Sequence, residues 1–311
     1  MLDVRRLRLL RELARRGTIA AVAEALAFSP SAVSQQLAVL EREAGLPLLE
    51  RTGRRVRLTP AAQNLVRHAE AVLERLEQAD ADLAEARSGL AGVLRVGSFP
   101  TATRAIVPAA LVHLARRHPG LEPRIRETDP AAVAHALRAG DLDVALVHEY
   151  DFVPAPPEPG LATRPLYEEA MYLAAPAVPA VPAAATGADQ GAVLRSRQDE
   201  PWITATPGTL CHAMTVRACQ AAGFTPRIRH QVDEFDTVLA LVAAGQGVAV
   251  VPQLGVTGPP DPAVVLTRLH MERRTKVAFR SGAAAHPAVA AFTAALRASV
   301  PPDLAGTGGE G

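Results

Sequence analysis

The feature that most constrains the fold is a helix start signal, Ser29 followed by Pro30, inside a short, basic, helical N-terminal segment. Serine is a preferred N-cap residue, and proline favours the first helical position. The segment before it predicts one helix over Val4–Arg15 and a short second helix capped by Thr18. The second and third helices are separated by a turn of a few residues. This arrangement predicts a helix-turn-helix at about residues 18–37.

The third helix has one apolar face and one polar face. Apolar residues at spacings of 4, 3 and 4 form a stripe that is expected to be buried: Val33, Leu37, Leu40 and Ala44. The opposite face carries small or polar residues: Ser31, Ser34, Gln35, Ala38 and Arg42. Hydroxyls and an amide can reach base edges in the DNA major groove, where glutamine pairs bidentately with adenine. The alternative is an ordinary three-helix surface with a polar outer face.

The charge distribution supports the DNA-binding interpretation. Residues 1–58 hold 11 Arg and six acidic residues, for a net charge of +5, whereas the whole chain has a net charge of +1. A compact basic head on a nearly neutral body is typical of a nucleic-acid binder. Residues 49–58 alternate apolar and basic side chains around a Thr-Gly turn, which predicts a hairpin. Such a hairpin is a wing, and we expect Arg51, Arg54 and Arg55 to contact DNA phosphates.

A long amphipathic helix is expected from Pro60. Its apolar residues repeat at spacings of 4 and 3: Leu65, Ala69, Val72, Leu76, Ala79, Leu83, Ala86 and Leu90. An a/d repeat over more than three heptads predicts a helix pair, with Leu65, Val72, Leu76, Leu83 and Leu90 in the seam. The alternative is an amphipathic helix packed on its own domain.

The remaining chain alternates strands and helices, which predicts a parallel α/β sheet. One helix is expected over residues 102–118. Strands are expected at residues 93–97, 122–127, 143–147, 169–174, 202–204, 227–232, 247–252, 264–269 and 275–279. Ligands in such sheets bind at the carboxyl ends of strands.

The head resembles the winged helix-turn-helix of LysR-type transcriptional regulators. The stretches GTIAAVAEALAFSPSAVSQQLAVLEREAG and LPLLERTGRRVRLTP carry this resemblance. Leu49 stands where the family usually has Phe, and Ala62 where it usually has Gly. Weaker similarities follow in the body: LRVGS at 94–98, GDLDVAL at 140–146, LVAAGQGVAVVP at 241–252 and HPAVAAF at 286–292. The resemblance covers residues 1 to about 300.

The resemblance implies a division of the chain and a set of partners. It implies a winged helix-turn-helix domain (1–59), a dimerising linker helix (60–90), an effector-binding domain (91–300) and a disordered tail (301–311). In the effector domain, lobe I comprises about 93–160 and 264–300, and lobe II about 161–263. The implied function is sequence-specific transcription regulation, modulated by a small molecule in a cleft between the lobes. The implied partners are operator DNA with an inverted repeat, a second copy of the chain in a homodimer and then a homotetramer, and RNA polymerase through indirect or transient contact.

Residues that follow the strands are candidates for the effector site. They are Ser98, Phe99, Pro100, Thr101, Thr128, Thr204, Thr206, Thr209 and Phe235. Hydroxyls and free N–H groups at two helix starts favour an anionic effector, such as a carboxylate. The alternative is that these hydroxyls are helix caps that would be present without any ligand.

The sequence disfavours enzyme chemistry and a resident cofactor. It contains no GxSxG or SxxK motif, and HEYDF at 148–152 is not the zinc motif HExxH. Histidine spacing predicts no metal site. Cys211 and Cys219 lie eight residues apart on one expected helix. Buried structural thiols are the favoured interpretation, and redox sensing is the alternative.

Two other classes of function are disfavoured. A solute-binding or enzymatic body with an incidental N-terminal fusion would be favoured by a signal peptide, and the N-terminus has no apolar h-region. We therefore expect a cytoplasmic protein without membrane spans. A DNA-packaging protein would be basic throughout, but residues 91–311 have a net charge of −1. Effector, operator and the direction of regulation are not encoded in these patterns.

Overall fold

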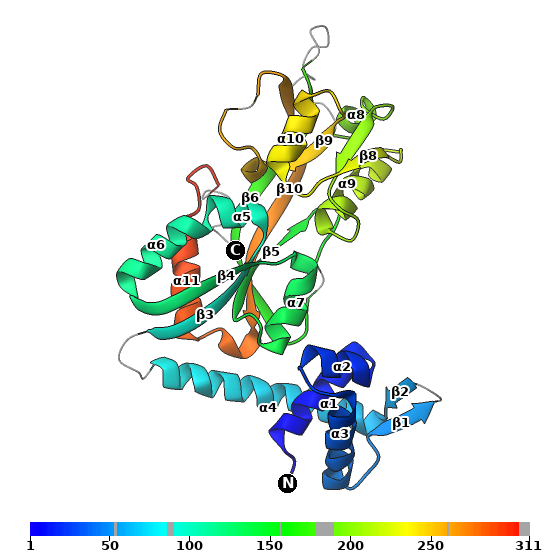
Figure 1. Ribbon diagram of the computed structural model, residues 1–311, viewed down its shortest axis with the longest axis vertical. Helices are drawn as coiled ribbons and strands as arrows, with labels where there is room; N and C mark the ends of the chain where they lie inside the picture. The colour runs from blue at the N-terminus through cyan, green and yellow to red at the C-terminus, as the bar shows by residue number, and fades with distance from the viewer. Residues whose placement is uncertain (53–54, 86–89, 156, 178–189, 260, 305–311) are drawn as a thin grey trace.

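The computed structural model shows an N-terminal head, one long helix and a two-lobed α/β body (Figure 1). It describes all residues except 53–54, 86–89, 156, 178–189, 260 and 305–311. Of residues 51–52, 55, 80–82 and 84–85 it describes only the backbone.

The head is the expected three-helix unit with a two-stranded wing. Its elements are α1 (Val4–Arg16), α2 (Ile19–Ala25), α3 (Pro30–Ala44), β1 (Leu49–Thr52) and β2 (Arg55–Leu58). The caps expected at Thr18 and Ser29 are present, since Thr18 accepts from the N–H of Ala21 and Ser29 from that of Ala32. Asp3, which the sequence analysis did not single out, caps α1 by accepting from the N–H of Arg5. The wing strands pair antiparallel in the register Leu49↔Leu58.

The long helix α4 (Pro60–Glu85) is shorter than expected. The sequence placed Leu90 on this helix, but Ala91 already begins a strand of the body. Leu90 instead packs against the apolar core of the first lobe. The placement of Leu90 in the helix seam is therefore wrong, because Leu90 belongs to the core of the body.

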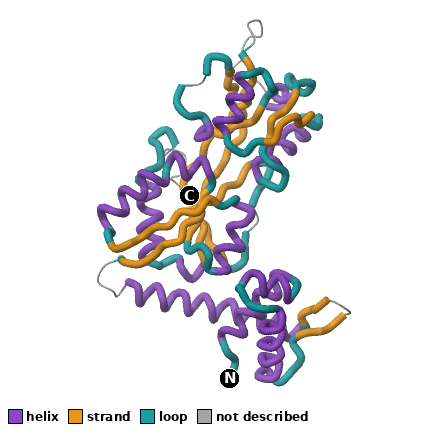
Figure 2. Tube along the Cα trace, in the orientation of Figure 1, coloured by secondary structure: helices purple, strands orange, loops and turns teal. Residues whose placement is uncertain are grey.

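The body is built on one six-stranded sheet that passes through both lobes (Figure 2). Its strands lie in the order β4 (Gly120–Glu127), β3 (Ala91–Ser98), β5 (Val144–Tyr150), β10 (Val264–Arg280), β6 (Leu161–Pro176) and β9 (Ala249–Pro252). A two-stranded parallel sheet, β7 (Pro201–Thr204) with β8 (Arg227–Gln231), completes the second lobe. The helices of the body are α5 (Pro100–Ala105), α6 (Val107–Arg117), α7 (Pro130–Ala139), α8 (Gln190–Arg195), α9 (Leu210–Ala221), α10 (Phe235–Ala243) and α11 (Pro287–Arg297).

Three expectations for the body are corrected. The sheet is mixed, because β10 runs antiparallel to both β5 and β6, and β6 runs antiparallel to β9. The two strands expected within residues 264–279 are one strand, β10, with irregularities between Arg268 and Glu272 and between Thr275 and Lys276. The helix expected over 102–118 is divided at Ile106, since Pro108 cannot donate a backbone hydrogen bond to the preceding turn.

Both ends of the body contribute to the core of the first lobe. Leu94 and Val96 of β3 pack in one apolar cluster with Phe279 of β10 and Phe292 of α11. Leu304 belongs to the same cluster and is 2 % exposed. The expected disordered tail therefore does not begin at residue 301, and its residues 305–311 lie outside the described chain.

Candidate functional site

Helix α3 presents the face that the sequence assigned to DNA. Val33, Leu37 and Leu40 are buried in the head, whereas Ser31, Gln35 and Arg42 are exposed and Ser34 is half-buried. The buried stripe holds the helix, so that the polar face is turned outward.

Thr18, Ser29 and Pro30 shape the helix-turn-helix. The hydroxyl oxygens of Thr18 and Ser29 accept hydrogen bonds from the first turns of α2 and α3. The Ser29 hydroxyl also contacts the hydroxyl of Ser31 at 3.0 Å. Ala27 in the turn has a φ of 54°, a left-handed conformation that is unusual for a residue with a Cβ atom. These residues orient α3, and each exposed hydroxyl remains close enough to the surface for a phosphate contact.

The wing is anchored by a residue that sequence analysis missed. The Glu41 carboxylate accepts from the backbone N–H groups of Leu48 and Leu49, at 2.9 and 3.0 Å. A glutamate near the end of α3 therefore fixes where the wing leaves the head. Arg54 lies outside the described residues, and only the backbone of Arg51 and Arg55 is described.

The expected seam on α4 is divided between two environments. Leu65 packs against the head core, together with the buried Ala69. Val72, Leu76 and Leu83 are 41, 46 and 63 % exposed. The first half of the helix thus packs on its own domain, as the alternative interpretation expected, and the second half leaves an apolar stripe free.

In the first lobe, the candidate effector residues follow β3 and β4. Ser98, Phe99 and Thr101 are buried, whereas Pro100 is exposed. Thr128 is half-buried, and its N–H donates to the carbonyl of Ser98, which brings the ends of the two strands together. Helix α5 has only six residues, so its N-terminus offers little of the dipole on which the expected anion site depended.

In the second lobe, the candidate hydroxyls bond to their own chain. Thr206 donates from both its N–H and its hydroxyl to the carboxylate of Asp233, at 2.8 and 2.7 Å. Thr209 caps α9 by accepting from the N–H of His212. Thr204 contacts the His212 ring at 3.3 Å. Thr209 thus matches the capping interpretation, whereas Thr206 and Thr204 are engaged by other side chains. Asp233 places a negative charge where an anion was expected.

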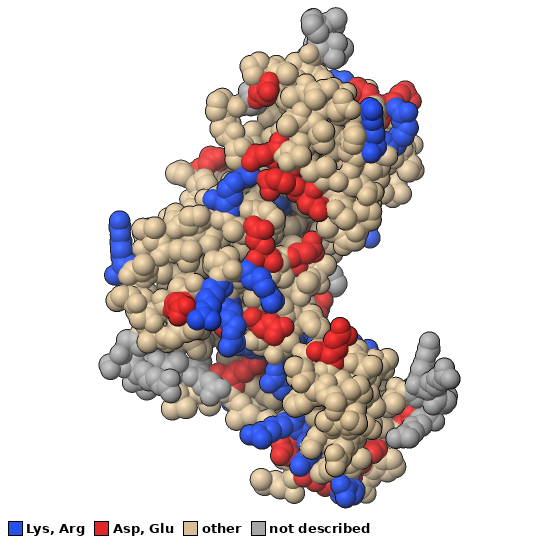
Figure 3. Space-filling view, in the orientation of Figure 1, with Lys and Arg blue, Asp and Glu red and all other residues tan. Residues whose placement is uncertain are grey.

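An arginine joins the two lobes beside these residues. Arg104 of α5 donates to the carboxylates of Glu234 and Asp236 at the start of α10, at 2.9 and 2.7 Å. Thr101 and Phe235 neighbour the two ends of this bridge, so the structure brings them to the same junction between the lobes. On the face drawn in Figure 3, acidic side chains gather across the middle of the body, with arginines among them.

Two buried polar rows cross the sheet beneath this junction, and sequence analysis missed them. Cross-strand pairing aligns Tyr167, Thr275 and His148 in one row, and Glu169, Arg273 and Tyr150 in the next. All six side chains are at most 5 % exposed. Glu169 lies at the start of an expected strand and was the one available signal, whereas Arg273 falls between the strands expected at 264–269 and 275–279.

Arg273 is the centre of this polar layer. It lies 2.7 Å from Glu169 and donates to the hydroxyl oxygen of Thr101 at 2.8 Å, which leaves the Thr101 hydroxyl proton free to donate elsewhere. Burial alone would lower the pKa of Arg273, but Glu169 together with Tyr150, Tyr167 and Cys211 more than offsets this, and the pKa lies above its ordinary value. The Arg273 guanidinium therefore keeps its charge beside the Glu169 carboxylate.

His148 is held neutral in the same layer. Burial, assisted by Arg273, places its pKa well below the usual value for histidine. Its ring contacts Phe99 and Tyr150 edge-on, with centroids 4.6 and 5.1 Å apart. Both ring nitrogens lack a hydrogen-bond partner within the described part of the chain.

The two cysteines are poor nucleophiles in this structure. Cys211 contacts the Tyr150 hydroxyl at 3.0 Å, and burial raises its pKa although Arg273 and Tyr150 oppose the shift. Burial raises the pKa of Cys219 to about 12. Eight residues of helix separate them by about 12 Å, too far for a disulfide without unfolding of α9.

No cluster of His, Cys, Asp or Glu within the described residues could hold a metal ion. None of the helices in that same part of the chain is long and apolar enough to cross a membrane.

Comparison with known proteins decides the family. The family described as "LysR substrate binding domain" matches residues 87–301, and "Bacterial regulatory helix-turn-helix protein, lysR family" matches residues 4–63. The chain belongs to the LysR family of bacterial transcriptional regulators. It is a LysR-type regulator with a DNA-binding helix-turn-helix head and an effector-binding domain, and its relatives are regulators rather than enzymes.

Individual relatives agree with this assignment. A "Probable hydrogen peroxide-inducible genes activator" of Mycobacterium avium is 33% identical over 235 residues, covering 75% of this chain and 72% of the relative. A cysteine mutant of OxyR from Corynebacterium glutamicum is 26% identical, with a TM-score of 0.55 over 96% of this chain and 92% of that one. Full-length CbnR in complex with its target DNA shares the fold, at 24% identity and a TM-score of 0.53 over 96% and 100% of the two chains. The match to the helix-turn-helix family supports DNA binding by the present chain.

Proposed function

We propose that this LysR regulator is a cytoplasmic protein that reads an inverted-repeat operator through the exposed face of α3. The observation that carries the proposal is the division of α3 into a buried stripe and an outward face with Ser31, Ser34, Gln35 and Arg42. One such helix reads only a few base pairs, so a symmetric operator requires two heads. Arg51, Arg54 and Arg55 of the wing supply attraction to phosphates that does not depend on base sequence.

The second half of α4 is the proposed dimer contact. Val72, Leu76 and Leu83 form an apolar stripe that the rest of their own chain leaves exposed. Pairing of two such stripes places two heads side by side. Assembly of two dimers into a tetramer, and an indirect or transient contact with RNA polymerase, complete the proposal.

The proposed effector site is the junction between the lobes, lined by Thr101, Thr128 and Phe235. The charges there argue against the expected anion. Asp233 occupies the helix start in the second lobe, Asp129 caps α7, and Arg273 is neutralised by Glu169. An uncharged or cationic small molecule with a hydrogen-bond acceptor for Thr101 fits these groups better.

Selection of duplexes from a random-sequence pool with the full-length protein tests the operator proposal. The selected duplexes are expected to share an inverted repeat. Gln35→Ala should lower affinity for the selected duplex by about 1–3 kcal/mol, with little change on random DNA. The control is Gln36→Ala, because the Gln36 amide accepts from Arg6 within the head. Equal losses on both duplexes would remove Gln35 from the reading face.

Screening small molecules by thermal unfolding tests the effector proposal. Three matched sets of compounds, bearing a carboxylate, an amide or an amine, are compared for their effect on the midpoint temperature. Stabilisation by amides or amines that is lost in Thr128→Val is expected. Stabilisation confined to the carboxylates would restore the anionic effector.

A further inference from the structure

The last turns of α7 in the body contact helix α1 of the head. Arg8 Nη2 donates to the carbonyl oxygen of Ala139 at 3.0 Å, across 131 residues of sequence. Arg16 Nη1 donates to the ring Nδ1 of His135, across 119 residues. Two residues of one head helix thus meet two positions on one helix of the effector domain.

A turn of the body next to α7 adds a third contact. Arg15 Nη2 donates to the carbonyl oxygen of Pro159 at 3.2 Å and to Glu70 of α4 at 2.8 Å. Gly160 leaves the room for this: a Cβ atom there would lie 3.0 Å from Arg15 Nη2, and its φ of 73° favours glycine. Arg15 therefore ties head, linker helix and body within one chain.

The charge of Arg8 complements the end of α7. The last carbonyls of a helix have no partner within the helix and form the negative end of its dipole. Ala139 is the last residue of α7, and Gly140 ends the helix in a left-handed conformation, with φ 82°. Arg8 places a guanidinium at this end, so it acts as a capping group supplied by another domain.

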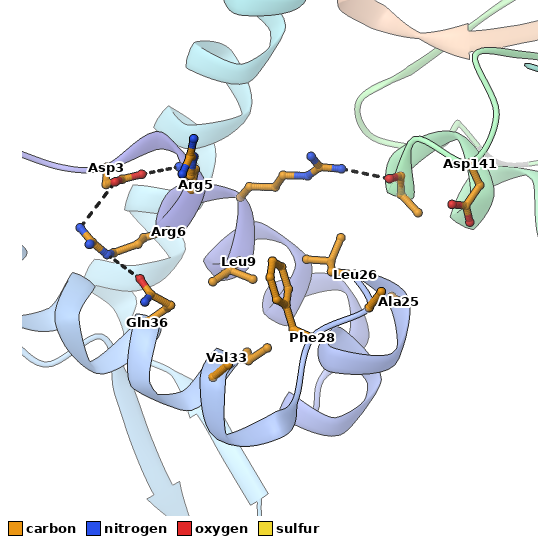
Figure 4. Close-up of a pocket in the computed structure, with 14 residues that line it drawn as sticks. Asp3, Arg5, Arg6, Leu9, Ala25, Leu26, Phe28, Val33, Gln36 and Asp141 are labelled. Carbon is orange, nitrogen blue, oxygen red and sulfur yellow. Dashed lines mark hydrogen bonds and ion pairs between the residues drawn. The ribbon is translucent and has the colours of Figure 1, made fainter. Parts of the chain in front are cut away.

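The contact between α1 and the body consists of a few hydrogen bonds, and α4 adds an ion pair between Glu77 and Arg280 at 3.2 Å. Beside the α1 contact lies a cavity of about 780 Å³ whose walls come from both domains (Figure 4). Figure 4 shows Leu9 and Phe28 of the head on one side of this space and Asp141 of the body on the other. The domains thus touch here through a few hydrogen bonds beside open space, as in interfaces that form and break readily.

The other end of α7 lies at the proposed effector site. Asp129 caps its N-terminus, directly after Thr128, whose N–H donates to the carbonyl of Ser98. The charge of Asp129 also acts on Cys211 in the second lobe. The ten residues of α7 span about 15 Å, from the junction of the lobes to the head.

We propose that α7 is a direct link between the effector site and the DNA-binding head of the same chain. Its C-terminal turn and Pro159 form a docking surface for α1. An effector that displaces the N-terminus of α7 moves this surface and reorients the head. The inference rests on the proposed effector site only for the identity of the signal, since the docking surface itself exists without any ligand.

Hydrogen exchange measured by mass spectrometry on the full-length protein, without DNA or effector, tests this link. The test variant is Arg8→Ala with Arg15→Ala and His135→Ala, which removes all three contacts between α1 and the body and keeps Arg16 on its buried partner Glu12. The control is Arg57→Ala with His113→Ala. Both control side chains are exposed, and the described residues offer them no hydrogen bond or ion pair that the control would remove.

Undocking is expected to speed exchange about fivefold or more at residues 136–142, and also at residues 128–133, while the control resembles the wild type. Wild-type exchange at 136–142 in the test variant would show that the head does not dock there. Faster exchange at 136–142 alone would show docking without transmission along α7, and would overturn the link. The exchange experiment uses neither DNA nor effector. A failed operator selection or compound screen would therefore not change its result, and the proposed function and the α7 link can fail independently.

Discussion

Replacing Arg273 with methionine is expected to destabilise the effector domain by about 3–5 kcal/mol, because the Glu169 carboxylate would be left buried without its cation. Arg273 and Glu169 are 1 and 2 % exposed, so water can replace little of the lost interaction. Methionine retains much of the arginine's volume, which keeps the cavity contribution small. At about 2–4 °C per kcal/mol for a domain of this size, the midpoint temperature should fall by about 6–20 °C.

Urea unfolding followed by the fluorescence of Trp202 measures this loss, since it is the single tryptophan and is fully buried in the second lobe. The double variant Arg273→Met with Glu169→Met should recover most of the stability, because it removes both charges together. Arg268→Met on the same strand is the matched control, as Arg268 is exposed. An Arg273→Met protein within about 1 kcal/mol of the wild type, or a double variant no better than the single one, would refute a desolvated pair.

Three other measurements follow from the structure. Leu76→Asp should convert the dimer to a monomer in sedimentation, whereas Val112→Asp, at an exposed site on α6, should not; a dimer that survives Leu76→Asp contradicts the seam. Since the pKa of His148 is depressed in the folded chain, the unfolded chain binds the extra proton once the pH falls below about 6.5. Stability should therefore decline from pH 7 to pH 5, and His148→Gln should reduce that slope in thermal melts; an unchanged slope argues against it. Because burial raises the pKa of Cys211, its labelling by a disulfide reagent at pH 8 should be at least about tenfold slower than that of free cysteine, and rapid labelling would favour redox sensing.

The head was predictable because its determinants are local. Caps at Thr18 and Ser29, and an apolar stripe at spacings of 4 and 3, act within a few residues of chain. The sequence analysis missed the break at Ile106, although Pro108 was a local signal for it, since proline removes a donor wherever it falls in a helix.

The polar layer of the body was not predictable in the same way. Glu169 and Arg273 meet only because β6 and β10 pair, and 104 residues separate them. A spacing pattern carries no information on which distant strands become neighbours. For the same reason the sequence could not show that Thr206 would be engaged by Asp233, 27 residues away, rather than by a ligand. Whether a hydroxyl bonds to its own chain or to a ligand depends on residues that are distant in the sequence.

The placement of α11 in the first lobe has a consequence for the order in which the protein becomes active during synthesis. The core of the head is complete once Ala69 has been made, whereas the first lobe lacks Phe292 and Leu296 until the final turns of the chain emerge. At about 5–20 residues per second, the remaining 242 residues take ~10–50 s. During that time the nascent chain has a complete DNA-binding head but no complete effector-binding domain. A chain truncated before Pro287 would keep the complete head but would lack part of the core of the first lobe. Such a chain would bind DNA without responding to an effector.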